Sequence, residues 1–90
     1  MSILKRIVLD VLKPHHPNAR DFAGAIADGV GGCCRIRVTV TEMDEKTEST
    51  LVTIEGEDIP YGDIVELITR LGASVNSIDE VEVSGAPESG

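Results

Sequence analysis

Hydrophobic and polar residues follow one plan twice along this chain. Each half holds a strand pattern, a helical pattern that opens near a proline and stops at glycine, and a second strand pattern. The first strand, Ile3 to Leu12, carries aliphatic residues on both faces, which is typical of a central strand covered on two sides. The last strand spans Ser74 to Val83. The pattern therefore predicts two similar halves that share one sheet.

The helices and inner strands show clear periodicities. Pro17 and Pro60 open the helices, because proline is tolerated in a first helical turn. The apolar helical stripes are Ala19, Phe22, Ala23, Ile26, Ala27 and Val30, then Ile64, Leu67, Ile68 and Leu71, and the helices stop at Gly29, Gly31, Gly32 and Gly72. Alternation predicts strands over 34–41 and 50–55, joined by an acidic loop, Glu42 to Ser49.

This order predicts an α+β fold, a ferredoxin-like split βαββαβ sandwich. Right-handed crossovers give an antiparallel sheet of order 4-1-3-2 with both helices on one face. The open face carries Leu4, Arg6, Val8, Asp10, Leu12, Arg35 and Arg37, and is a candidate surface for self-association or ligand binding. We expect residues 1–85 to form a single domain and 86–90 a disordered tail, with Ser84 and Gly85 already in the irregular C-terminal segment.

Composition narrows the classes of function. The net charge of -8 argues against binding to nucleic acid or to an anionic membrane surface, and favours cations or a basic protein partner. The basic pair Lys5 and Arg6 is followed by too short an apolar run for a signal peptide, so we expect a cytoplasmic protein. Cys33 and Cys34 are interpreted as two small apolar residues that enter a strand, since a bridge between strand neighbours requires backbone strain.

The strongest candidate for a ligand-binding site lies at the C-terminal end of the first strand. Lys13 and His15 stand before a helix N-terminus, where free N–H groups favour anions. The predicted topology brings Asp10, Asn76 and Ser77 close to them. These five residues are the candidate ligand-binding set, suited to a small carboxylate or another anion, and the alternative is a turn with solvated side chains.

Carboxylates offer candidate cation sites. Asp10, Asp79 and Glu80, with His15, are expected near the junction of the first and last strands. Glu42, Asp44 and Glu48 fall in the acidic hairpin loop, which lacks the glycine and spacing of an EF-hand. Ca²⁺ and Mg²⁺ are the candidate ions. The alternatives are edge-strand charges that block aggregation and a solvated acidic turn.

Three segments and a hairpin pattern resemble domain of unknown function family 211, a family of short, mostly archaeal proteins. The segments are Leu9 to His15, Thr53 to Gly56 and Ser77 to Val81, and the hairpin residues are Glu42, Asp44, Thr47 and Glu48. The resemblance runs from about Leu4 to Gly85 and implies a ferredoxin-like fold, ring-shaped homo-oligomers and no established activity. The family usually has an acidic residue where His16 stands and a histidine where Asn76 stands, so a two-histidine metal site would lack one ligand here.

The sequence holds no nucleophile elbow, phosphate-binding glycine loop or HExxH pattern, and we assign no catalytic residue. We therefore expect a non-enzymatic, homo-oligomeric binding module that senses a small metabolite or a divalent cation. The alternatives are a small metal-dependent enzyme that uses Asp10, His15 and Asp79, and a purely structural assembly subunit.

Overall fold

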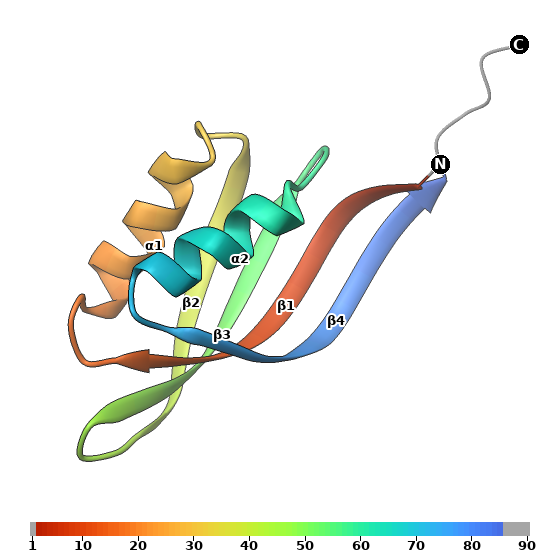
Figure 1. Cartoon of the computed structure of the whole chain (residues 1–90). Coiled ribbons are helices and arrows are strands. Elements are labelled where there is room, and N and C mark those ends of the chain that lie inside the picture. The colour runs from red at the N-terminus through yellow and green to blue at the C-terminus, as the bar shows by residue number, and fades with distance from the viewer. Residues whose placement is uncertain (1, 86–90) are drawn as a thin grey trace, which may run out of the picture.

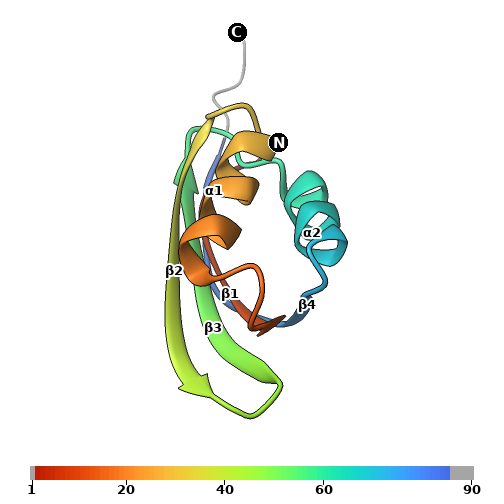
Figure 2. The same ribbon diagram turned by 90° about the vertical axis from the view of Figure 1, so that its left-hand side faces the viewer.

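The computed structural model describes residues 2–85, which form a four-stranded sheet with two helices on one face (Figures 1 and 2). The elements are β1 (Ser2–Pro14), α1 (Ala19–Gly29), β2 (Cys34–Met43), β3 (Thr47–Gly56), α2 (Tyr61–Arg70) and β4 (Ser74–Gly85). The strands are antiparallel and lie in the order β2-β3-β1-β4. This confirms the predicted ferredoxin-like α+β fold and its strand order. Within the described residues, neither helix is long and apolar enough to cross a membrane.

The core lies between the sheet and the helices and is almost wholly aliphatic. It contains Ile7, Leu9 and Val11 of β1, Val52 and Ile54 of β3, Phe22 and Ile26 of α1, and Ile64 and Ile68 of α2, together with Ile59 and Ala73 from the connections. Burying one large aliphatic side chain contributes about 1.5–3 kcal/mol, so these contacts are the main stabilising term. The helices therefore sit where their apolar stripes meet the inner faces of β1 and β3.

The pairing of β1 with β4 is irregular at three places, and one of them corrects a prediction. The register shifts between Leu4 and Arg6, so Lys5 is an extra residue in β1. An extra residue reverses the alternation of side chains on the strand before it. Leu4 therefore packs against the core, and its predicted place on the open face is wrong.

The boundaries of several elements differ from those predicted. Pro17 does not lie in the first helical turn, because α1 begins at Ala19 and Asn18 caps it, with the Asn18 side chain accepting a bond from the Asp21 N–H at 2.9 Å. The predicted loop from Glu42 to Ser49 is only three residues long. The strands extend into it because the Asp44 N–H donates to the Thr47 carbonyl at 2.8 Å, which closes a tight hairpin.

The predictions for residues 33–34 and for residues 84–85 also need correction. Ser84 and Gly85 belong to β4, where Gly85 pairs with Ser2, and the prediction for residues 86–90 lies outside the described residues. Cys33 and Cys34 are joined by a disulfide, contrary to prediction. That prediction treated both as strand residues, whereas Cys33 lies in the turn after Gly31 and Gly32, before β2 begins.

Candidate functional site

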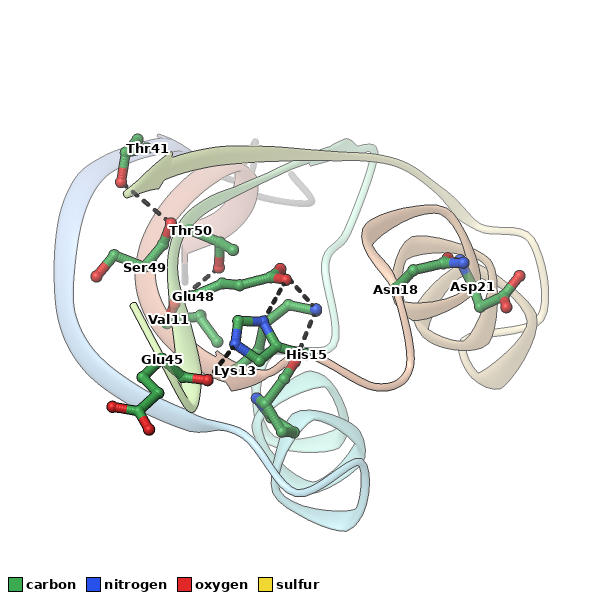
Figure 3. Close-up of polar contacts among 11 residues, drawn as sticks. Val11, Lys13, His15, Asn18, Asp21, Thr41, Glu45, Glu48, Ser49 and Thr50 are labelled. Carbon is green, nitrogen blue, oxygen red and sulfur yellow. Dashed lines mark hydrogen bonds and ion pairs between the residues drawn. The ribbon is translucent and has the colours of Figure 1, made fainter. Parts of the chain in front are cut away.

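The last buried position of β1 holds a charged side chain. Lys13 is in phase with Val11, points to the helix side of the sheet and is 0% exposed. Its Nζ donates to Glu48 Oε1 at 2.9 Å and to the Pro14 carbonyl at 2.8 Å (Figure 3). The same Nζ lies 5.8 Å from the centre of the Phe22 ring. The ammonium group is therefore satisfied by the chain itself. Lys13 was expected to help bind a carboxylate ligand. In the structure its carboxylate partner is the Glu48 side chain of the same chain.

Glu48 joins Lys13 to a histidine. Its second oxygen, Oε2, lies 2.9 Å from His15 Nδ1, and His15 Nε2 lies 3.0 Å from the Glu45 carbonyl oxygen (Figure 3). Each ring nitrogen of His15 thus faces an acceptor, an arrangement that suits the protonated imidazole. The hydrogen bond to Glu48 raises the pKa of His15, and the bonds from His15 and Lys13 lower the pKa of Glu48.

Lys13, His15 and Glu48, here called the clamp, tie three parts of the chain together. Lys13 ends β1, His15 follows it, and Glu48 stands at the second position of β3, beside the hairpin turn that contributes Glu45. Buried ionic groups need full hydrogen bonding to be tolerated. The clamp meets this need, because within residues 2–85 no buried side-chain nitrogen or oxygen lacks a partner. The clamp fixes the hairpin against the end of β1.

The rest of the predicted ligand-binding set lies elsewhere. Asp10 pairs in register with Ser77, as predicted, and the Ser77 hydroxyl donates to Asp79 Oδ1 at 2.7 Å. These residues sit at the β1–β4 junction, whereas His15 reaches toward β3, on the opposite side of β1. The structure therefore divides the predicted ligand-binding residues into two groups. The prediction that His15 lies close to Asp10 and Asp79 is wrong.

The candidate cation ligands are also spread out. Glu42 lies in β2, Asp44 in the turn, and Glu48 points into the clamp, while Glu80 is bridged to Arg6 at 3.5 Å. Within residues 2–85, no three His, Cys, Asp or Glu side chains gather closely enough to hold a metal ion. The described part of one copy therefore holds no assembled cation site.

A hollow of about 560 Å³ opens at the other end of the sheet. Its lining mixes both signs of charge: Lys5, Arg35, Glu55, Gly56, Glu57, Glu82 and Ser84. The hollow is shallow and open to solvent, and Lys5 already bonds to Glu57 at 2.8 Å. Sequence reasoning did not identify it, because Arg35 of β2 and Ser84 of β4 come from opposite edges of the sheet.

Comparison with known proteins gives the family. The profile of domain of unknown function family 211, described as uncharacterised ArCR, matches residues 5–86. The chain belongs to this family. It is also 42% identical over 81 residues to the uncharacterised protein MJ0319 of Methanocaldococcus jannaschii, an alignment that covers 90% of this chain and 82% of that protein.

Membership of family 211 agrees with the fold and brings no activity with it. At the two positions noted as departures, His16 is exposed, and Asn76 is exposed at a shift in the β1–β4 register. The His15 ring is held by Glu48 and the Glu45 carbonyl. Sequence reasoning missed this partnership, and Glu45 with it.

Proposed function

We propose that this protein is a non-enzymatic, homo-oligomeric binding module, whose assembled form holds a small metabolite or a divalent cation. The observation that carries the proposal is a row of exposed aliphatic side chains on β4. Ile78, Val81 and Val83 are 48%, 52% and 56% exposed. Three such residues on one edge strand form a surface that soluble monomers rarely leave uncovered.

The position of this aliphatic row on β4 suits a surface that a second copy covers. Val81 is in register with Ile7 and Val83 with Leu4, both on the helix side of β1. Residues in register share a face, so the row continues the apolar inner face of the sheet. The helices stop short of it, and β1 and β4 extend past them as a two-stranded arm (Figure 1).

The charges support a ligand held between copies. The chain carries a net charge of -8 and exposed carboxylates on β2, the hairpin and β4. The described part of one copy gathers no three metal-binding side chains, and we propose that a cation site combines carboxylates from more than one copy. A ring-shaped assembly is the form we propose, with Ca²⁺ and Mg²⁺ as the first ions to test.

Native mass spectrometry tests the proposal, after metal removal and again after addition of Ca²⁺ or Mg²⁺, beside a thermal-shift screen of metabolites. We expect a mass that is a multiple of 9.6 kDa and a rise in melting temperature with at least one ligand. A monomer indifferent to every ligand contradicts the proposal. An assembly indifferent to every ligand supports a purely structural subunit instead.

A further inference from the structure

The open face of the sheet carries a row of charges that alternate in sign from edge to edge. Arg35 of β2 pairs in register with Glu55 of β3. Glu55 pairs with Arg6 of β1, and Arg6 pairs with Glu82 of β4. Residues in register share a face of the sheet. The row therefore begins with a positive charge at the β2 edge and ends with a negative charge at the β4 edge.

The two ends of this row are not neutralised within the described chain. Arg6 bridges Glu55 at 2.9 Å and Glu80 at 3.5 Å, which satisfies the middle of the row. Within residues 2–85, neither Arg35 nor Glu82 forms an ion pair, and the same is true of Arg37. All three are exposed and lie on the edge strands.

We infer that β2 of one copy pairs with β4 of the next copy, so that the sheet and its charge row continue from copy to copy. Within residues 2–85, both strands are hydrogen-bonded to a neighbouring strand on one side only. Because each neighbouring pair in the sheet is antiparallel, β2 and β4 run in opposite directions. A second copy placed beside the first therefore meets it as an antiparallel pair. The inference rests on the proposed homo-oligomer and names its contact.

The register of this contact follows if the charge row crosses from one copy to the next without a shift. Arg35 then faces Glu82 of the neighbouring copy, and Arg37 faces Glu80. The positions between them match as well: Ile36 faces Val81, and both lie on the helix side. The residues that would pair lie in regular stretches, since β2 has no register shift over 34–40 and β4 has none over 80–82. One register thus pairs opposite charges on one face and aliphatic side chains on the other.

Symmetric contacts between like edges fit poorly. A β4–β4 contact sets the acids Glu80 and Glu82 against the same acids, and a β2–β2 contact sets Arg35 and Arg37 against arginines. Like charges directly opposite one another destabilise a strand pair. The β2–β4 contact avoids both clashes and covers Val81. It is a head-to-tail contact, so it repeats around a closed ring or along a filament.

Two charge-reversed variants test the contact when mixed. One is Arg35→Glu with Arg37→Glu, which makes both edges negative; the other is Glu80→Arg with Glu82→Arg, which makes both edges positive. We expect each variant alone to sediment as a monomer of about 9.6 kDa and an equimolar mixture to assemble. The control, Arg20→Glu with Glu66→Lys, reverses exposed charges on the two helices and should assemble like the wild type.

The outcomes separate the β2–β4 contact from the proposed homo-oligomer. If the wild type assembles and either variant alone assembles equally well, or if the folded variants do not assemble when mixed, the β2–β4 contact is wrong and the proposed oligomeric function stands. A monomeric wild type overturns both. Circular dichroism establishes that each variant folds. If a double variant does not fold, Arg37→Glu and Glu80→Lys are mixed in its place, since they leave Arg35 and the Arg6–Glu55 ion pair unchanged.

Discussion

Lys13 Nζ and Glu48 Oε1 lie 2.9 Å apart in an ion pair that solvent barely reaches, with side chains 0% and 8% exposed. The pair joins the end of β1 to the start of β3, next to the hairpin turn. Removing one partner of a buried pair leaves an uncompensated charge, whereas replacing both with apolar groups is often neutral. The pair therefore reports directly on how the clamp stabilises this end of the sheet.

Glu48→Ala is expected to lower the free energy of unfolding by about 3 kcal/mol, because it leaves the Lys13 ammonium buried without its carboxylate. The double variant Lys13→Met, Glu48→Met should recover most of this loss. Urea unfolding followed by circular dichroism measures both. Lys5→Ala, which removes an exposed pair with Glu57, is the control and should change little. Equal destabilisation by Glu48→Ala and by the double variant would contradict the buried-charge explanation.

The pH dependence of stability should carry the signature of the clamp. The pKa of His15 is raised from 6.5, so its contribution is complete below pH 6.5 and is lost as the pH rises through the raised value. The pKa of Glu48 is lowered from 4.5, so its contribution is complete above pH 4.5 and is lost as the pH falls through the lowered value. Unfolding free energies should therefore be highest between these limits. His15→Gln should flatten the decline of the free energy of unfolding above pH 6.5. An unchanged decline in that variant would show that deprotonation of His15 is not its cause.

Val81→Glu should separate the copies without unfolding them. The substitution places a carboxylate in the exposed aliphatic row, where we expect Ile36 of a neighbouring copy. Val81 is 52% exposed in the single chain, so the free energy of unfolding of the isolated copy should change by no more than about 0.5 kcal/mol. Size-exclusion chromatography with light scattering gives the mass. Met43→Glu, an exposed apolar residue beyond the proposed pairing, is the control, and equal behaviour of the two variants would count against the contact.

Reduction of the Cys33–Cys34 disulfide should leave the fold intact. A disulfide stabilises mainly by closing a loop in the unfolded chain, and a bridge between adjacent residues closes almost none. Thermal unfolding with and without dithiothreitol, beside a Cys33→Ser variant, is expected to differ by less than about 0.5 kcal/mol. Loss of cooperative unfolding on reduction would show that the bridge organises the start of β2.

The fold could be predicted because each element carries an unbroken local pattern. The alternation of Ile36 and Val38 with arginines marks β2 as an edge strand, and the stripe that includes Ile64 and Ile68 marks α2. The displacement of Leu4 could not be predicted, because the extra residue at Lys5 arises from pairing with β4 and leaves no mark on β1 alone. Local patterns thus determine elements, while tertiary pairing decides their irregularities.

The sequence carries a signal for the clamp in the alternation of its buried positions. Extending the alternation of Leu9 and Val11 by one step puts Lys13 on the buried face, and extending that of Val52 and Thr50 backward puts Glu48 there as well. A buried lysine requires an acid, so the two charges predict each other. Assigning Glu48 to a loop concealed this. The topology alone predicted that Asp10 lies beside Ser77, whereas the register shifts of β4 around these residues depend on the pairing itself and had no such signal.

Sedimentation equilibrium of the wild-type chain over a wide concentration range tests the central claim most directly. The exposed row on β4 and the unlike charges on the two edges predict a mass that is a whole-number multiple of 9.6 kDa and is larger than one copy at micromolar concentration. A mass of 9.6 kDa at every concentration would contradict the homo-oligomeric binding module and the edge contact together.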